Sequence, residues 1–513
     1  MPAILQSLPQ RIGDVVNRWA ERSPDRKALV ESSGYWTYQT LDDAVSKTQT
    51  WLSDLAVRPG DRVMIVCENC RALVAILLAL TNLDAWPVLV NARLSAREVD
   101  EIRDHCGARR IIYTTSVSPQ ATQHARRHSA AIENISELGQ LGISPVNRDA
   151  KPEPIDRNIT HRVAALIYTS GTTGLPKGVM LTHRNLLFVA AVSADIRNLT
   201  LDDRLYGVLP ISHAVGLSVV LLGALLSGAT LYLAPRFDPV AALATMKNDA
   251  LSVVLGAPAM FSLLLEYTSL KGIKSLQLPA LRIISSSSAP LQPALKSQTE
   301  SLFGLTLHNG YGVTECSPNI AQTRLEAPSE DVSVGRIFPG VDVKLVDTEG
   351  KSVPEGEIGE LRVRGPNIMK GYYRAPEETS AAIDQEGWFN TGDLARLEDG
   401  TLFIVGRTRE VIVRFGYNVY PAEVEAVINS HPQVVRSAVV GGSAKGVEGG
   451  EDVVAYVQLS PGSNLTLSEL ENYASQYLAP YKRPSHVVLL PDMPLSPTGK
   501  VIKHELAKIV ERI

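Results

Sequence analysis

Short apolar runs recur through the first 300 or so positions, and several of them lead into a turn rich in glycine, serine or proline. RVMIVC (62–67) and RIIYT (110–114) have the pattern of buried strands, and the apolar stretch between them, CRALVAILLALTNL, has the length of a helix. The same rhythm returns in RLYGVLP, SVVLGAP and LRIISSSSAP. Alternating strands and helices predict parallel sheets covered by helices, so we expect an α/β fold with two doubly wound halves.

The pattern changes from about residue 331, where VDVKLVD, GELRVRG and TLFIVGR are joined by polar turns. Short strands joined by polar turns predict a third, smaller antiparallel subdomain that is β-barrel-like. After GRTRE (406–410), strands such as VVAYVQL alternate with helical stretches such as AEVEAVINSHP. We therefore predict a large N-terminal domain over residues 1–406 and a smaller α+β C-terminal domain over residues 407–513.

Composition and charge narrow the function classes. The chain is 45% hydrophobic and 20% charged, with a net charge of only -4, which is typical of a globular protein and predicts no nucleic-acid partner. The first 26 residues lack the continuous apolar core of a signal peptide, so a cytoplasmic location is expected. The longest apolar run, which starts at Ser218, is short for a membrane span; it predicts a buried helix followed by a buried strand and no stable membrane insertion.

Two of the four cysteines, Cys67 and Cys70, form a CxxC motif. Such a pair is compatible with a redox centre or half of a zinc site. No second ligand pair follows, because Cys106 and Cys316 stand alone. We interpret Cys67 and Cys70 as reduced structural thiols.

The stretch YTSGTTGLPKG (168–178) is a predicted loop, because its glycines and Pro176 weaken both helix and strand. It follows the strand-like VAALIYTS. Successive backbone N–H groups of such a loop bind one anion, hydroxyl groups add further donors, and Lys177 supplies a positive charge for phosphate. The Walker A spacing is absent, and a plain linker remains the alternative.

Three further stretches carry candidate chemistry. NGYGVTECSP (309–318) places a ring, a hydroxyl and a carboxylate together in Tyr311, Thr314 and Glu315, a combination suited to a base, a phosphate and Mg²⁺, although a capped strand-to-helix turn would have the same pattern. Asp393 and Arg407 flank a predicted hairpin and together suit a ribose, with surface charges as the alternative. Lys500 lies in a loop bracketed by proline and glycine, PLSPTGKV, and gains interest only from the other three stretches.

In their order and approximate spacing, YTSGTTGLPKG, GYGVTE, TGD, GR and PTGK resemble the motifs of the adenylate-forming superfamily of acyl-CoA synthetases, luciferases and nonribosomal adenylation domains. The resemblance covers essentially the whole chain. It implies an enzyme that uses ATP and Mg²⁺ to convert a small carboxylic acid to an acyl-adenylate with release of pyrophosphate. Coenzyme A (CoA) then accepts the acyl group. We expect a monomer or a homodimer.

The resemblance also implies roles for individual residues. The catalytic set is Lys177, Thr314, Glu315 and Lys500, with Glu315 as the Mg²⁺ ligand and Lys500 acting in adenylation only. In the nucleotide site, Tyr311 would stack on adenine, Asp393 would bind the ribose hydroxyls and Thr314 the α-phosphate. The full nucleotide-binding set is Thr169, Ser170, Gly171, Thr172, Thr173, Gly174, Lys177, Ala289, Pro290, Asn309, Gly310, Tyr311, Gly312, Thr314, Asp393, Phe403, Arg407 and Lys500.

The same resemblance places an apolar acyl pocket around His213, Val215, Gly216, Gly256, Gly310 and Gly312, with plain core packing as the alternative for each. Malonate-activating relatives carry an arginine where this chain has Gly310, which disfavours a dicarboxylate. The expected substrate is a medium- to long-chain fatty acid or an aromatic acid.

The C-terminal domain of this superfamily rotates between the two half-reactions, and the resemblance places the hinge at Arg409, where relatives carry Asp or Lys. Gly416 and Tyr417 would border the CoA path. Phe415 stands where relatives have a small residue, so it either narrows the thiol channel or merely lines it.

Three functions remain open on the sequence. An acyl-CoA ligase would release AMP only with both acid and CoA present. An enzyme that loads a carrier protein would exchange pyrophosphate without CoA turnover, and no carrier domain follows Ile513, so the carrier would be a separate chain. A noncatalytic nucleotide-binding protein would bind ATP without exchange.

Overall fold

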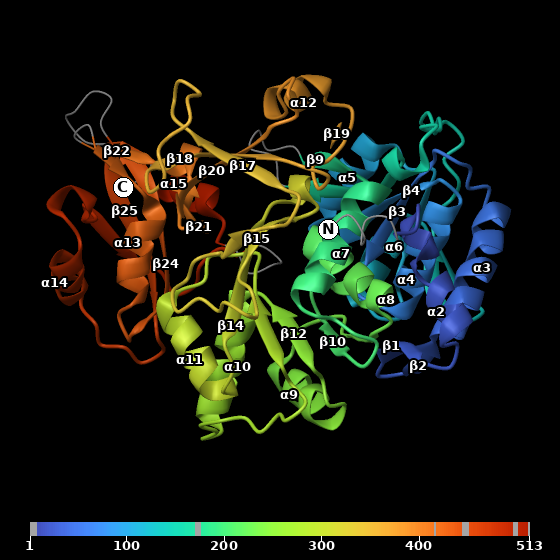
Figure 1. The fold of residues 1–513 in the computed structure, drawn as a ribbon, viewed down its shortest axis with the longest axis horizontal. Helices are drawn as coiled ribbons and strands as arrows, with labels where there is room; N and C mark the ends of the chain where they lie inside the picture. The colour runs from blue at the N-terminus through green and yellow to red at the C-terminus, as the bar shows by residue number, and fades with distance from the viewer. Residues whose placement is uncertain (1–7, 170–175, 415–416, 444–450, 496–500, 511–513) are drawn as a thin grey trace.

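Two large sheets and a smaller C-terminal unit make up the protein, as a computed structural model shows (Figure 1). The structure describes residues 8–169, 176–414, 417–443, 451–495 and 501–510. The sheets have 8 and 13 strands, and the C-terminal unit has sheets of 3 and 2 strands. The chain therefore divides into a large α/β part and a smaller α+β part, as the sequence pattern predicts.

The eight-stranded sheet has the order β19-β9-β8-β4-β3-β5-β7-β6. Its parallel centre is β8, β4, β3 and β5. Every residue of β3 is buried, as a strand covered on both faces by helices requires. The bounds are β3 (Arg62–Cys67), β4 (Trp86–Asn91), β5 (Arg110–Tyr113), β6 (Ala131–Ile135), β7 (Gly139–Ile143), β8 (Val163–Thr169), β9 (Lys177–Thr182) and β19 (Gly371–Tyr372).

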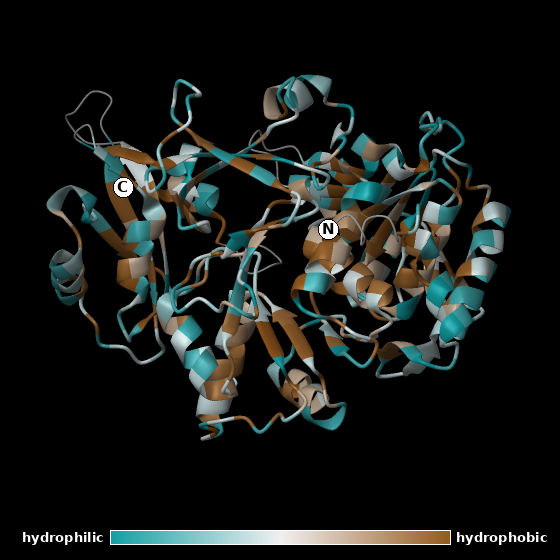
Figure 2. Cartoon of the chain, viewed as in Figure 1, coloured by the Kyte–Doolittle hydropathy of each residue, from teal (hydrophilic) through white to brown (hydrophobic). Residues whose placement is uncertain are grey.

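The parallel part of the 13-stranded sheet has the order β14-β13-β12-β10-β11-β1. The two predicted doubly wound halves are confirmed, and Figure 2 shows their strands as largely hydrophobic. One strand was not expected: the early β1 lies in this second sheet, next to β11. The bounds are β1 (Lys27–Glu31), β2 (Gly34–Thr37), β10 (Arg204–Gly207), β11 (Thr230–Leu233), β12 (Val253–Gly256), β13 (Ile283–Ser286) and β14 (Leu307–Gly312).

The predicted antiparallel subdomain does not form a sheet of its own. Its strands continue the second sheet beyond β14 in the order β15-β16-β21-β20-β18-β17, while β19 pairs with β9 of the first sheet. The subdomain therefore joins the edges of both sheets. The bounds are β15 (Asn319–Gln322), β16 (Arg336–Ile337), β17 (Asp342–Val346), β18 (Ile358–Arg364), β20 (Phe389–Glu398) and β21 (Thr401–Arg407).

Helices cover both large sheets, and most start at a capping residue or a proline. In α5, for example, the Ser95 side chain accepts from the backbone of Glu98 while Glu98 caps Ser95 in return. The α-helices of this part are α2 (Asn17–Arg22), α3 (Tyr38–Asp54), α4 (Arg71–Asn82), α5 (Ala96–Cys106), α6 (Pro119–Arg127), α7 (His183–Ile196), α8 (Gly223–Ser227), α9 (Pro239–Asn248), α10 (Pro258–Leu270), α11 (Pro293–Phe303) and α12 (Pro376–Ala382). The 3-10 helices of this part are η1 (Ile12–Val15), η2 (Ile159–His161) and η4 (Thr314–Cys316), and η3 (Val215–Leu222) is a π-helix.

The C-terminal unit, drawn orange to red in Figure 1, packs helices on a sheet of order β24-β25-β26. A core that includes Val424, Val439, Val453 and Leu470 holds the helices and the sheet together. The bounds are η5 (Thr408–Glu410), β22 (Ile412–Arg414), β23 (Tyr417–Val419), α13 (Pro421–Asn429), β24 (Val434–Ser443), β25 (Glu451–Leu459), α14 (Leu467–Tyr477), η6 (Pro480–Lys482), β26 (His486–Leu489) and α15 (Lys503–Val510).

The expectations for the CxxC motif and the apolar run are also met. Cys67 and Cys70 are buried free thiols, and burial raises the pKa of the Cys70 thiol to about 12. The Cys70 sulfur caps α4 by accepting from the Leu73 N–H at 3.4 Å. The run from Ser218 forms the buried η3 and α8 followed by β11. None of the helices in the described part of the chain has the length and apolarity needed to cross a membrane.

Candidate active site

The site forms where parallel strands β13 and β14 end side by side. Ser286 of β13 lies opposite Asn309 of β14. Since both strands run the same way, the turn after β13, with Ala289 and Pro290, reaches the same edge as Tyr311. These residues were predicted to surround the adenine, and the topology brings the two segments together.

Tyr311, Asp393 and Arg407 form a connected group at this edge. The Tyr311 hydroxyl donates a hydrogen bond to the Asp393 carboxylate. Strands β20 and β21 pair Asp393 with Arg407, whose Nε lies 3.3 Å from Asp393 Oδ1. Asp393 is only 4% exposed, so it is not a surface charge, while Arg407 is exposed. Burial, together with the neighbouring Asp393, raises the pKa of Tyr311 well above 10 and keeps it a donor.

A second group contains Lys177 and Glu315, which are linked through Tyr372. The Tyr372 hydroxyl donates to Glu315 Oε1 at 2.9 Å. The Lys177 ammonium lies over the Tyr372 ring, 5.1 Å from its centroid. Sequence reasoning missed Tyr372 because an uncharged tyrosine in the segment KGYYRAPEET has no local pattern that indicates a phosphate or metal site. The predicted phosphate lysine and metal carboxylate thus share one neighbour.

The predicted phosphate loop is bracketed by a strand on each side. Thr169 ends β8 and pairs with Lys177, the first residue of β9. Ser170, Gly171, Thr172, Thr173 and Gly174 lie outside the described residues, as do Lys500, Phe415 and Gly416.

Two of the residues predicted to contact the nucleotide, Asn309 and Phe403, also have contacts within the protein. The Asn309 amide donates to the carbonyl oxygens of Val332 and Ser333, at 3.0 and 3.2 Å. The Phe403 ring lies beneath the guanidinium of Arg396, which is 5.0 Å from its centroid. These contacts show that both side chains support the strands that carry the candidate site.

Comparison with known proteins identifies the family. Residues 16–373 match the AMP-binding enzyme family, and residues 423–500 match the AMP-binding enzyme C-terminal domain. The chain belongs to the AMP-binding enzyme family. This result confirms the resemblance to the adenylate-forming superfamily and the prediction of an enzyme of the acid–thiol ligase class.

Individual relatives of this AMP-binding enzyme match over nearly its whole length. Feruloyl-CoA synthase from Amycolatopsis sp is 33% identical, covering 97% of this chain and 99% of the relative. 4-Coumarate–CoA ligase from Pinus taeda is 32% identical, covering 94% and 91%. Among solved structures, O-succinylbenzoate CoA synthetase (MenE) from Bacillus subtilis in complex with ATP and magnesium superposes with a TM-score of 0.81, at 28% identity and with coverage of 96% and 99%.

This class of ligase depends on ATP, Mg²⁺ and CoA, and the described residues fit the first two. Among the described residues, no group of three or more His, Cys, Asp or Glu side chains is arranged around a metal. This agrees with Mg²⁺, which commonly binds through one or two carboxylates together with substrate phosphates rather than in a full protein cage. Glu315 is such a lone carboxylate, and Asp393 is a buried carboxylate that can accept the hydroxyls of a ribose.

The glycines of the expected acyl pocket of this AMP-binding enzyme divide into two kinds. A Cβ at Gly216 or Gly312 would lie 2.0 Å from the carbonyl oxygen of Pro210 or Pro318, so packing requires these glycines. A Cβ at Gly256 would be tight against the Phe261 ring, at 3.1 Å. At Gly310 the nearest atom would be 3.5 Å away, an ordinary contact. A Cβ at position 310 would therefore fit without displacing its neighbours.

The other two predicted pocket residues lie where the chain enters η3. The His213 N–H donates to the Pro210 carbonyl oxygen at 2.9 Å, and Val215 begins η3. Both side chains are half-buried. Gln322, opposite Gly310 in the β14–β15 pair, is a buried neighbour that sequence reasoning did not single out.

The predicted hinge lies between two anchored residues. Thr408 Oγ1 donates to Glu360 of β18 at 3.3 Å, on the N-terminal side. Glu410 is bound by the Lys503 ammonium of α15 at 2.9 Å, on the C-terminal side. Arg409 lies between them and is exposed. Further on, Tyr417 is exposed and stacks on Tyr481, with ring centroids 4.7 Å apart.

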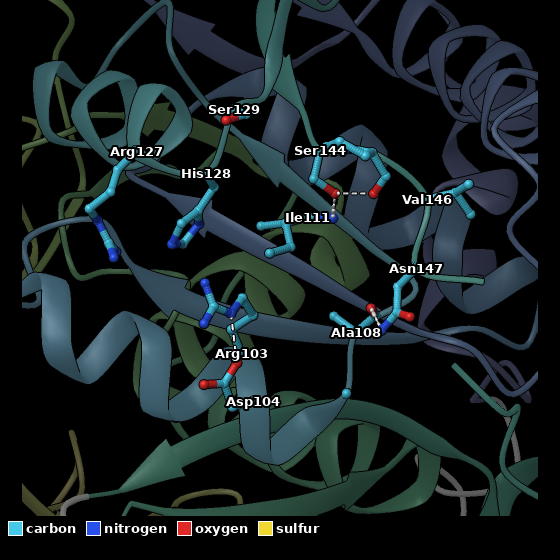
Figure 3. A pocket seen from close by; sticks show the side chains of 12 residues that line it. Arg103, Asp104, Ala108, Ile111, Arg127, His128, Ser129, Ser144, Val146 and Asn147 are labelled. Atoms are coloured by element: carbon cyan, nitrogen blue, oxygen red, sulfur yellow. Dashed lines mark hydrogen bonds and ion pairs between the residues drawn. The ribbon is translucent and has the colours of Figure 1, made fainter. Parts of the chain in front are cut away.

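A separate cavity of about 630 Å³ lies between α5, α6 and the end of β7 (Figure 3). Arg103, Arg127 and His128 line it, and each is paired with Asp100. Asp100 and Asp104 compensate the charges of the two arginines, and no predicted site residue lines the cavity, so we assign it no part in the chemistry.

Proposed function

We propose that this enzyme ligates an apolar monocarboxylic acid, either aromatic or a medium- to long-chain fatty acid, to CoA through an acyl-adenylate. The observation that carries the proposal is the convergence of two groups at the end of β14: Tyr311 with Asp393, and Glu315 with Tyr372 and Lys177. Relatives named for 4-coumarate and feruloyl groups, which are aromatic, support the substrate class. Gly310 itself contributes no side chain and no charge, which suits an uncharged acyl group.

In the first half-reaction a carboxylate oxygen of the acid attacks the α-phosphorus of ATP, and pyrophosphate leaves. A carboxylate and a triphosphate repel each other, so positive charge and hydrogen-bond donors at the phosphates lower the barrier. Asp393 binds the ribose hydroxyls and Tyr311 stacks on adenine, which fixes the nucleotide. Lys177 neutralises the outgoing phosphates, and Thr314 donates to the α-phosphate.

Glu315 would hold Mg²⁺, which would supply positive charge to offset the charge on the phosphates during the transfer. Lys500 completes the set by contacting the acid carboxylate and the α-phosphate during this half-reaction alone.

In the second half-reaction the CoA thiolate attacks the acyl carbon, and AMP leaves. Rotation at Arg409 removes Lys500 and presents the strand that starts at Tyr417. The anchors on either side of Arg409, at Thr408 and Glu410, support a pivot confined to this residue. Thus one fold serves both steps without two complete active sites.

The test is release of AMP and pyrophosphate with Mg·ATP across fatty, aromatic and dicarboxylic acids, each with and without CoA. CoA-dependent turnover of an apolar acid is expected. Pyrophosphate exchange that CoA leaves unchanged would show a carrier-loading enzyme instead, and ATP binding without any exchange would overturn catalysis altogether.

A further inference from the structure

We propose that Tyr372 is a positioning residue that holds the Glu315 carboxylate and the Lys177 ammonium as one unit, so that Mg²⁺ and the ATP phosphates meet a preformed site. The inference rests on the proposed roles of Glu315 and Lys177. Tyr372 comes from β19, whereas Lys177 belongs to β9 and Glu315 to η4, so Tyr372 lies outside both sequence motifs.

The hydroxyl group of Tyr372 orients Glu315. It donates to Oε1 at 2.9 Å, which leaves the other carboxylate oxygen to bind a cation. Burial and the nearby Glu315 charge raise the pKa of Tyr372 above its usual value, so the phenol remains a donor at working pH. A carboxylate fixed in this way loses less rotational freedom when a metal binds.

The ring of the same residue faces Lys177. The ammonium lies 5.1 Å from the ring centroid, within the range of a cation–π contact. The strand register explains the contact: Tyr372 pairs with Val179, and Lys177 lies two residues away on the same face of β9. Tyr372 thus contacts the two predicted phosphate-site groups with different parts of its side chain.

The backbone around Tyr372 is itself fixed. The Tyr372 N–H donates to Thr379 Oγ1 of α12 at 2.9 Å. Gly371 has φ +143°, and a Cβ there would lie 2.8 Å from the Thr379 side chain, so the close approach requires glycine. The Met369 N–H donates to the Glu315 carbonyl oxygen at 2.8 Å. The segment therefore holds Glu315 by its main chain as well as by its carboxylate.

The neighbouring Tyr373 provides a matched control. Its hydroxyl donates to Glu153 at 2.5 Å, so it also bonds a carboxylate, but one outside the proposed phosphate site. Tyr372 packs against the core that contains Val179, whereas Tyr373 belongs to a separate core with Tyr113, so the two rings lie in different surroundings. Removing either hydroxyl is the same chemical change at adjacent positions, and only one of them is aimed at the metal site.

The experiment measures ATP affinity by isothermal titration calorimetry over a range of Mg²⁺ concentrations, and AMP affinity without Mg²⁺. Tyr372→Phe is expected to raise the Mg²⁺ concentration needed for tight ATP binding by about tenfold, the scale of one hydrogen bond to a charged group. AMP affinity should be unchanged, as should the Mg²⁺ requirement of Tyr373→Phe. In pyrophosphate exchange, saturating Mg²⁺ should restore the rate of Tyr372→Phe.

Glu315→Gln separates this inference from the proposed function. If Glu315→Gln raises the Mg²⁺ requirement and Tyr372→Phe does not, the role of Tyr372 is overturned while that of Glu315 stands. If neither variant changes it, both assignments fail. In the double variant the Tyr372→Phe effect should vanish, because Tyr372 acts through Glu315; an undiminished effect there would overturn the inference even if Tyr372→Phe also lowered thermal stability.

Discussion

Tyr311 and Asp393 are 82 positions apart in the chain, yet the phenol of the first donates a hydrogen bond to the buried carboxylate of the second. The bond joins the residue proposed to stack on adenine to the residue proposed to bind ribose. The Asp393 carboxylate thus accepts from a hydroxyl group, the same kind of donor that a ribose would present. The bond therefore links the two sides of the proposed nucleoside site before ATP enters it.

This relationship gives a prediction for the nucleoside half of the site. Asp393→Ala should raise KM for ATP by about 100-fold, since each hydrogen bond to a charged group contributes about 1.5–3 kcal/mol and a ribose offers two hydroxyls. Tyr311→Phe keeps the ring, and ribose replaces the lost donor, so its KM should stay within about threefold. Steady-state kinetics with ATP varied measures both. A loss in Tyr311→Phe as large as in Asp393→Ala would contradict the exchange of donors.

The two glycines on either side of Tyr311 in β14 should respond in opposite ways. Gly312→Ala places a Cβ 2.0 Å from the Pro318 carbonyl oxygen and is expected to lower the free energy of unfolding by about 2 kcal/mol or more. Gly310→Ala makes only ordinary contacts, so stability should hold while KM rises for bulky aromatic acids and much less for small ones. Thermal unfolding and kinetics with acids of graded size check the pair. Equal KM shifts for all acids would remove Gly310 from the acyl pocket.

A proline in place of Arg409 should allow one half-reaction and block the other. A proline fixes φ near −65° and restricts the preceding residue, which opposes rotation between the anchored Thr408 and Glu410. Arg409→Pro is therefore expected to keep one half-reaction and to lose most of the other, whereas Arg409→Ala should keep both. Pyrophosphate exchange and thioester formation from supplied acyl-adenylate are the two measurements. Retention of both rates in Arg409→Pro would place the pivot elsewhere.

His183 should make the protein sensitive to acid. Its Nδ1 accepts from the Ile12 N–H at 3.1 Å, and burial, with Arg11 and Arg162 nearby, lowers its pKa to about 3. The unfolded chain binds this proton near pH 6.5, so between pH 6.5 and 3 the free energy of unfolding falls by about 1.4 kcal/mol per unit as the pH falls.

The matched variant is His183→Gln, which cannot titrate. Urea unfolding at pH 7 and pH 5 should show that the wild type loses about 2 kcal/mol more than His183→Gln over this interval. The other histidines are the same in both proteins, so their contributions to the pH dependence of the free energy of unfolding cancel in the comparison. Equal losses would show that His183 does not carry this proton linkage.

The alternating α/β architecture, the antiparallel region and the α+β unit could be predicted from the sequence, because strand and helix periods are properties of neighbouring residues. Local motifs likewise marked Lys177, Glu315 and Asp393. The structure was needed to show that β1 lies in the second sheet and that the β region joins both sheets, since strand pairing over long separations leaves no local signal. For the same reason the burial of Asp393 beneath Tyr311, and the placement of Tyr372 between Lys177 and Glu315, follow from the packing of distant segments. In isolation, a tyrosine in a short edge strand has no distinguishing chemistry; its role arises from the two charged groups that the fold places beside it.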